Sequence, residues 1–422
     1  MGVIAVWLKT FKENLSLIKG NLRILILSWM LMTPVMIMLS VYEPLYINGL
    51  GASTAIVGLI YSISTIVLSL VRILGGYVAD RYGRKKIIVF MSFGVALSYL
   101  FYAYATSWEW ILIGAIFLNV CLLYQPALLA IRADSVPPEK RGIGFALGDF
   151  FSLIASVPAP ITITYLVSTM GLINGMRIAY LIAVSLAICS AFLRLLLKET
   201  LSYEERRFST ENFTEHLKDF KNEYSDATKF VLKSFPALIM VYILCNFAFW
   251  GCYPLLSFFS VDFLGVSQED WGFLNILSTI VYVVVVLPVG VLLDKIGRKK
   301  VLLPFIGVIA ISAFLYALTP SRTNYTLLFL VVSFPVVMFA QFLLSILFPA
   351  IEADLVSRRK RGRVTAVLML VSSFAGAAGQ ALGGIMYEQI DPRFPFQILV
   401  AFVTISFFII LLWIKEPAKR EA

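Results

Sequence analysis

Residues 50–86 read LGASTAIVGLIYSISTIVLSLVRILGGYVADRYGRKK, and residues 264–300 read LGVSQEDWGFLNILSTIVYVVVVLPVGVLLDKIGRKK. The two stretches align without gaps at an offset of 214, and 15 of their 37 positions are identical. Each contains an apolar run long enough to cross a hydrocarbon core of roughly 30 Å, followed by the basic end Gly-Arg-Lys-Lys. The repeat predicts that one membrane-embedded unit occurs twice in this chain.

The composition supports a membrane protein. The 422 residues are 60% hydrophobic and 14% charged, whereas soluble domains contain about 45–50% apolar and about 25% charged residues. A single soluble core cannot bury such an excess of apolar side chains. We therefore expect an all-α integral membrane protein, with the lipid bilayer as one of its partners.

Apolar runs between charged or turn-rich breaks predict twelve transmembrane helices. Their expected limits are 22–47, 54–79, 86–106, 109–132, 143–168, 175–197, 235–261, 270–293, 300–319, 324–351, 364–387 and 394–414.

The basic residues predict the orientation of these helices. If the N-terminus is cytoplasmic, the outer loops contain only Arg177, Arg322 and Arg393 of the 35 Lys and Arg residues. This is the bias of the positive-inside rule, so we expect both termini in the cytoplasm and the chain in the cell membrane, as a multi-pass protein. The same distribution explains the net charge of +10 without a nucleic-acid partner.

The repeat also predicts the domain organisation. A second pair, Ala133-Asp134 through Arg141-Gly142 against Ala353-Asp354 through Arg361-Gly362, recurs at an offset of 220 on the same expected side. Equal sidedness indicates two parallel halves of six helices. The expected parts are an amphipathic cytoplasmic segment (1–21), an N-terminal bundle (22–197), a cytoplasmic linker (198–234), a C-terminal bundle (235–414) and a cytoplasmic tail (415–422).

The loops that end the two repeats, Gly76 to Lys86 and Gly290 to Lys300, resemble the signature loop of the major facilitator superfamily. That motif is Gly, three residues, Asp-Arg/Lys, one residue, and Gly-Arg/Lys-Arg/Lys. The resemblance extends over the chain from about residue 20. It implies two parallel six-helix bundles that give alternating access to a midplane site.

By this resemblance the loops hold the cytoplasmic side shut in the outward-facing state. A carboxylate at such a helix end can cap a helix of the other half and pair with a base. We expect Arg84 to pair with Asp134, and Arg298 with Glu352 or Asp354. Gly76 and Gly290 are expected to allow close helix approach, and Gly83 and Gly297 a tight turn. The full set of expected gating residues is Gly76, Asp80, Arg81, Gly83, Arg84, Asp134, Arg141, Gly290, Asp294, Gly297, Arg298, Glu352 and Asp354. The alternative is that the basic residues of these loops only set the orientation of the helices in the membrane.

The chain lacks a phosphate-binding Gly-x-x-x-x-Gly-Lys-Ser/Thr loop, and it has no histidine within an apolar run. We therefore expect neither an enzyme nor a cofactor-dependent pump. A proton or other ion gradient is the expected driving force, and a functional monomer the expected state.

Two carboxylates inside expected spans, Glu43 and Asp149, are candidates for proton coupling, because a desolvated carboxylate can carry a proton between states. The alternatives are an interfacial position for Glu43 and an ion pair of Asp149 with a base such as Arg72. Polar and aromatic residues expected to line the cavity are Tyr42, Asn119, Gln125, Asn246, Trp250, Tyr253 and Gln341. Hydrogen bonds between helices are the alternative role for these.

The segment from Tyr42 to Lys86 resembles the drug and metabolite efflux branch, which implies proton-coupled efflux of a small hydrophobic or amphipathic solute. That branch usually carries an arginine in the fourth span, where this chain has Gly114. The alternative is a proton-coupled uptake symporter for a sugar or other small metabolite. An anion carrier is not expected, since Arg72, Arg132, Arg177 and Arg194 all fall near the ends of expected spans.

Overall fold

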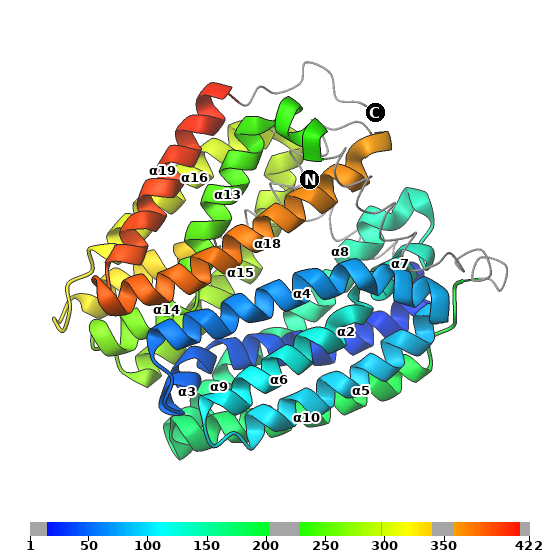
Figure 1. Ribbon diagram of the computed structural model, residues 1–422, viewed down its shortest axis with the longest axis horizontal. Helices are drawn as coiled ribbons and strands as arrows, with labels where there is room; N and C mark the ends of the chain where they lie inside the picture. Colours follow the sequence, from blue (N-terminus) through cyan, green and yellow to red (C-terminus); the bar gives the residue numbers. More distant parts are fainter. Residues whose placement is uncertain (1–14, 202–227, 297, 340–357, 414–422) are drawn as a thin grey trace. The chain divides into compact units, whose positions relative to one another are not determined.

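The computed structural model describes residues 15–201, 228–296, 298–339 and 358–413, with the backbone alone in 286–302 and 358–363. Within these ranges the chain forms helices and no β-strand (Figure 1).

The N-terminal part consists of long helices joined by short turns. They are α2 (Gly20–Ser40), α3 (Glu43–Gly49), α4 (Thr54–Tyr82), α5 (Arg84–Ala103), α6 (Trp108–Cys121), η2 (Leu122–Tyr124), α7 (Gln125–Asp134), α8 (Arg141–Ser156), α9 (Pro158–Met170) and α10 (Leu172–Leu195). Two further short 3-10 helices are η1 (Leu15–Leu17) and η3 (Pro138–Lys140).

The C-terminal part begins with a helix at Thr228–Ser234, which meets α13 (Pro236–Cys252) at an angle of 102°. The remaining elements are α14 (Leu255–Phe258), the π-helical η4 (Phe259–Phe263), α15 (Gln268–Ile296), α16 (Arg298–Ala317), the helix Thr326–Phe339, α18 (Arg358–Gln389) and α19 (Phe394–Trp413).

Helices lie on all twelve expected spans, except that residues 340–351 fall outside the described part of the chain. Among the described helices, eight are long and apolar enough to cross a membrane, or nine if the bent pair at Ser234 counts as one span. The chain is therefore a multi-pass helical membrane protein.

Prolines lie at the helix breaks within four of the expected spans. Pro44 follows the turn between α2 and α3, Pro126 follows the 3-10 turn η2, Pro158 begins α9, and Pro254 directly precedes α14. Proline cannot donate a backbone hydrogen bond and clashes with the preceding turn. Three candidate site residues, Glu43, Gln125 and Tyr253, directly precede such prolines and therefore lie at helix breaks.

The described residues group into two units. One contains residues up to 46 and 67–201, and the other contains 47–66 and the residues from 228 onward. In the first unit α2 packs against α8 and α10, and α5 packs against α6 and α10. In the second unit α13 packs against α18 and α19. The long helix α4 is shared, because its first half belongs with the C-terminal helices. The domain limits expected from the sequence assign all of α4 to the N-terminal bundle, and they stay a prediction.

Each unit has an aromatic core. Tyr46, Tyr102 and Tyr180 are buried in the first unit, where the Tyr102 and Tyr180 rings stack 4.8 Å apart. In the second unit, the rings of Phe259 and Phe396 lie 4.5 Å apart. Burial of such rings contributes both hydrophobic area and specific ring contacts.

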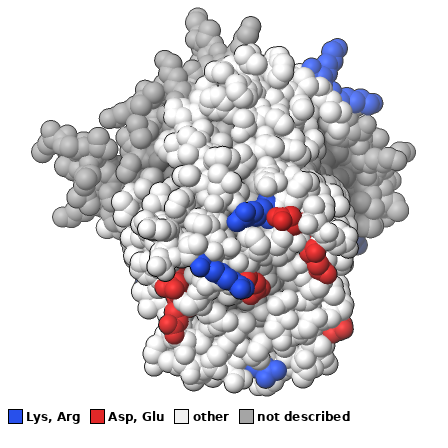
Figure 2. Space-filling model, turned by 90° about the vertical axis from the view of Figure 1, so that its left-hand side faces the viewer, with Lys and Arg blue, Asp and Glu red and all other residues white. Residues whose placement is uncertain are grey.

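Large apolar side chains also cover the outside of the helices. Met36, Phe90 and Phe192 are each more than half exposed. Figure 2 shows a face on which the Lys, Arg, Asp and Glu side chains of the described residues are few and scattered. Apolar surface of this extent suits a lipid environment rather than water.

Candidate functional site

The turn between α4 and α5 carries the first signature loop. Gly83 has a φ of +96°, which L side chains rarely adopt, so a glycine is needed for α5 to start one residue after α4 ends. This turn brings Arg84 back over the last turn of α4.

Arg84 joins two helices through two carboxylates. Its Nε donates to Oδ1 of Asp80 at 3.2 Å, and its Nη1 donates to Oδ2 of Asp134 on α7 at 2.7 Å. The Arg84 side chain is only 17% exposed, whereas both carboxylates are more than 40% exposed. Arg84 Nη1 also donates to the Thr200 hydroxyl at 3.3 Å. The pair expected between Arg84 and Asp134 is thus formed, and its gating role stays a prediction.

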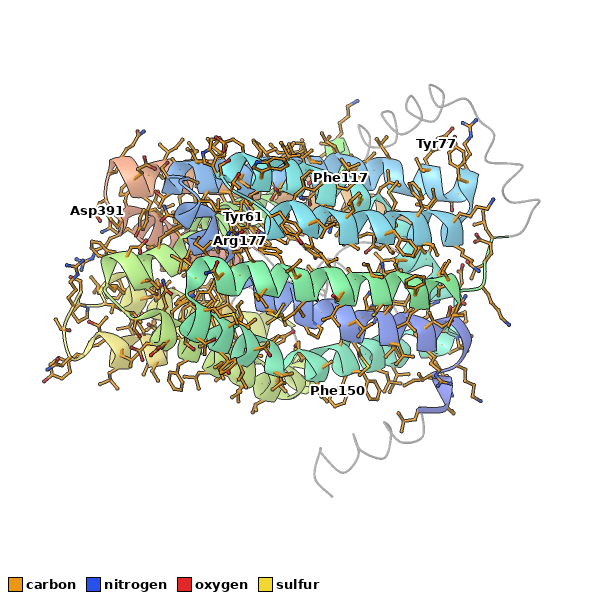
Figure 3. All side chains as sticks on the ribbon, turned by 90° about the horizontal axis from the view of Figure 1, so that it is seen from below. Tyr61, Tyr77, Phe117, Phe150, Arg177 and Asp391 are labelled. Atoms are coloured by element: carbon orange, nitrogen blue, oxygen red, sulfur yellow. The ribbon has the colours of Figure 1, made fainter. Side chains whose placement is uncertain are left out.

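The neighbouring residues of this loop have smaller roles. Arg81 donates to the Tyr77 hydroxyl at 2.8 Å, and Tyr77 lies toward one end of the helices of this unit (Figure 3). Arg141, which begins α8, donates to the carbonyl oxygen of Ala133 at 3.1 Å. These contacts tie the loops at this end of the first unit to one another.

The expectation that Gly76 permits close helix approach is not met within the first unit, and an approach to the other half stays a prediction. A Cβ at Gly76 would meet nothing within 4 Å, whereas one at the adjacent Gly75 would overlap the carbonyl oxygen of Leu123. Successive helical residues point about 100° apart, so only one of the two glycines can face the fourth span. Close approach therefore depends on Gly75.

The second signature loop cannot be compared in the same way. The structure describes only the backbone of Gly290, Asp294 and Arg298, and Gly297, Glu352 and Asp354 lie outside the described residues. Their expected pairing stays a prediction.

Glu43 lies in an aromatic environment at the start of α3. It is close enough to Tyr99 and Tyr102 of α5 for its charge to act on both hydroxyls. Among the described side chains, no Lys or Arg nitrogen lies within 4.0 Å of its carboxylate. Arg177, at the start of α10, instead donates to the carbonyl oxygen of Ala105 at 2.8 Å (Figure 3).

Asp149 forms an ion pair, with a different base from the one suggested by the sequence. Its Oδ1 accepts a hydrogen bond from Nη2 of Arg132 at 2.8 Å, and its side chain is 70% exposed. The Arg132 guanidinium is buried between the rings of Trp29 and Phe145, at 4.7 and 4.3 Å from their centres. The structure thus contains the alternative of an ion pair for Asp149, but with Arg132 as the base, because Arg72 contacts Gln125 instead.

Two of the expected cavity residues are buried in helix packing. Tyr42 is fully buried. Asn119 is 8% exposed and donates to the carbonyl oxygen of Ala115 within its own helix. The hydrogen bond of Asn119 thus stays within its own helix, and a cavity-lining role for both residues stays a prediction.

The other expected cavity residues are partly buried. Asn246 donates to the Ser372 hydroxyl of α18 at 3.3 Å, and the rings of Trp250 and Tyr253 lie 5.6 Å apart. Gln125 accepts a hydrogen bond from Arg72 at 2.8 Å. Gln341 lies outside the described residues.

Sequence reasoning misjudged Arg72. It falls only four residues beyond Leu68, the midpoint of α4, which is about 6 Å along the axis. The expectation that it lies near a span end is therefore wrong, because α4 extends to Tyr82, beyond the expected limit. The repeat does not indicate this position, since it shows only that residue 286, which aligns with Arg72, is a valine.

Sequence reasoning also missed Glu388, in the last turn of α18. Its Oε2 accepts hydrogen bonds from the Ala55 backbone N–H at 2.9 Å and from the Thr54 hydroxyl at 3.2 Å. The carboxylate thus caps the N-terminus of α4. No local pattern at Glu388 indicates this partner, because the two residues are 333 positions apart.

Comparison with known proteins agrees with this architecture. The family model of the Major Facilitator Superfamily matches residues 24–351 and 238–422. Multidrug resistance protein 2 of Bacillus subtilis (strain 168) is 26% identical over 354 residues, which are 81% of this chain and 82% of that protein. The Na(+), Li(+), K(+)/H(+) antiporter of Planococcus maritimus is 30% identical over 167 residues, 37% of this chain and 36% of that protein.

A solved structure has the same fold. A mutant of the nucleoside transporter NupG superposes with a TM-score of 0.74 at 17% identity, over 94% of this chain and 100% of that one. This likeness shows the fold, and the family match over most of the chain identifies it as a member of the major facilitator superfamily, a multi-pass membrane transporter and not an enzyme.

Proposed function

We propose that this transporter moves a small hydrophobic or amphipathic solute out of the cell in exchange for protons. It does so by alternating access of two six-helix halves, with twelve transmembrane helices and both termini in the cytoplasm. It works as a monomer in the cell membrane and uses an ion gradient rather than a cofactor.

The likeness to Multidrug resistance protein 2 over four fifths of the chain supports the direction and the solute class. The composition of the candidate cavity agrees with it, because Trp250 and Tyr253 offer adjacent aromatic faces in the second unit. Pockets for such solutes combine apolar and aromatic walls with a few polar groups.

The observation that carries the proton-coupling part is the environment of Glu43. A carboxylate near two tyrosines, with no described base within 4.0 Å, has no positive charge to stabilise its ionised form. It can therefore bind and release a proton as its surroundings alternate between closed and hydrated. Asp149 is the weaker candidate, because it forms an ion pair with Arg132 and its side chain is 70% exposed.

The loop around Arg84 supports alternating access. A guanidinium between Asp80 and Asp134 ties the ends of α4 and α7 together at one end of the first unit. In this proposal the cluster forms a rigid cytoplasmic end of the bundle, and Asp80 meets the other half when the cytoplasmic side closes.

The proposal can be tested in proteoliposomes of phosphatidylethanolamine and phosphatidylglycerol that contain a trapped pH-sensitive dye. The probes are three naphthalene derivatives of equal ring size and fixed charge: naphthalene-2-sulfonate, 2-naphthamide and trimethyl-(2-naphthyl)ammonium. We expect at least one probe to drive proton movement in the opposite direction through the wild-type protein, and no probe to do so through Glu43→Gln.

The outcomes separate the alternatives. Proton movement in the same direction as a sugar, with none for the aromatic probes, would instead support the uptake symporter. Probe movement without protons in the wild-type protein would refute proton coupling.

A further inference from the structure

Arg72 places a positive charge close to the middle of α4. Its Cα lies about 27 Å along the helix from Thr54 and about 15 Å from Tyr82, at 1.5 Å per residue. Charged side chains at such depth face the bundle interior or a water-filled cavity, because exposure to lipid is costly.

The fold does not require this arginine. The repeat aligns Arg72 with residue 286, a valine, in the corresponding helix α15. The same helical unit is thus built with an apolar side chain at the equivalent position. A charge kept in one copy alone points to a role specific to that copy.

In the described part of the chain, the guanidinium of Arg72 forms a hydrogen bond through its Nε alone. Its Nε donates to Oε1 of Gln125 at 2.8 Å, and the close approach of Gly75 to Leu123 fixes α4 against the same break in the fourth span. The residue is more than a third exposed. Among the side chains that the structure describes, no carboxylate lies within 4.0 Å of it. With respect to the described residues, the Nη1 and Nη2 groups of Arg72 therefore remain available to a ligand.

A second arginine increases the positive potential at this break. Arg194 of α10 is 3% exposed, donates to the Ser92 hydroxyl at 2.7 Å, and lies 4.9 Å from the ring centre of Tyr124. It too has no carboxylate within 4.0 Å in the described part of the chain. Tyr124 and Gln125 are consecutive, so two uncompensated cations border one helix break.

We propose that Arg72 is a substrate-binding residue, and that the solute is an amphipathic organic anion. The two Nη groups form a paired donor edge for the two oxygens of a carboxylate or sulfonate, while Gln125 orients the guanidinium. The apolar part of the solute lies along the uncharged helix faces. This assignment rests on the proposed transport function and names its solute class.

The test measures equilibrium binding in detergent, which requires no gradient. Dissociation constants for naphthalene-2-sulfonate and 2-naphthamide are obtained from thermal stabilisation of wild-type protein, Arg72→Val, Arg72→Lys and the control Arg23→Val, which removes an exposed positive charge from α2. Arg72→Val copies residue 286 of the second repeat. Arg72→Gln replaces it if the valine variant fails to fold.

We expect the wild-type protein to bind the sulfonate at least tenfold more tightly than the amide. Arg72→Val should lose that preference without a change in amide binding, Arg72→Lys should retain part of it, and Arg23→Val should behave as wild type. Equal affinity of wild-type protein for both probes, or sulfonate binding unchanged in Arg72→Val, overturns the proposal.

The two proposals fail separately. Arg72-dependent sulfonate binding without coupled proton movement would refute the proposed exchange and leave the anion site standing. Proton exchange driven by the amide or the ammonium probe alone would support the proposed exchange and refute the anion site.

Discussion

Glu388 accepts a hydrogen bond from the backbone N–H of Ala55 at 2.9 Å, so the last turn of α18 caps the first turn of α4. Next to this cap, the backbones of α4 and α18 lie in direct contact, since a Cβ on Gly58 of α4 would overlap the carbonyl oxygen of Gln380 of α18. Thr65 continues the contact by donating to Oε1 of Gln380 at 2.8 Å. These contacts explain why the first half of α4 groups with the C-terminal helices.

Glu388→Ala should expose the first-turn amides of α4. Loss of a capping acceptor costs about 0.5–2 kcal/mol, and Glu388→Gln should cost less because the amide oxygen still accepts a hydrogen bond. Hydrogen–deuterium exchange of peptides covering residues 54–60 is the measurement, with faster exchange expected in Glu388→Ala. Asp391→Ala, in the following turn, serves as the control. Unchanged exchange in Glu388→Ala would show that the cap does not hold this turn.

Gly75 and Gly76 are adjacent and should respond in opposite directions to alanine. A Cβ at Gly75 overlaps Leu123, so Gly75→Ala should destabilise the protein by about 1–3 kcal/mol. A Cβ at Gly76 meets open space, and Gly76→Ala should be neutral or stabilising by up to about 1 kcal/mol, since alanine favours helix. Thermal unfolding in detergent compares the two variants directly. Equal effects would contradict the packing described for this helix.

The apolar runs and the repeat predict the helices, because each span carries its own hydropathy pattern. The contact of Arg84 with Asp134 is implied by the resemblance to the signature loop, and the structure contains it. The roles of Gly75 and Arg72 do not follow from such patterns. They depend on the rotation of α4 and on its length beyond Asp80, which hydropathy does not determine. The Glu388 cap depends on packing between segments far apart in the sequence.

Asp80→Asn tests the gating role of the signature loop. The Arg84 pairs are partly solvated, so their loss should change stability by only about 0–1 kcal/mol. A gating role should nevertheless reduce transport in proteoliposomes several-fold and change the inward–outward population, measured by distances between spin labels on the two halves. Glu139→Gln, which removes an exposed carboxylate from η3 outside the gating set, is the matched control. If neither transport nor the population changes in Asp80→Asn, the loop only sets topology.

Asp149→Asn should keep proton coupling that Glu43→Gln abolishes. Arg132 holds a buried guanidinium between Trp29 and Phe145, and Asp149 neutralises it from the solvated side. Since Asp149 is 70% exposed, loss of its charge should cost about 1 kcal/mol or less. Arg132→Gln should cost more, because it also removes two cation–π contacts worth about 0.5–2 kcal/mol each. Probe-driven proton movement and the unfolding temperature are measured for each variant. A residue of a structural ion pair should change the unfolding temperature alone, whereas a proton carrier should change the proton movement. Loss of coupling in Asp149→Asn, with coupling retained in Glu43→Gln, would transfer the proton site from the aromatic surroundings of Glu43 to the Arg132 pair.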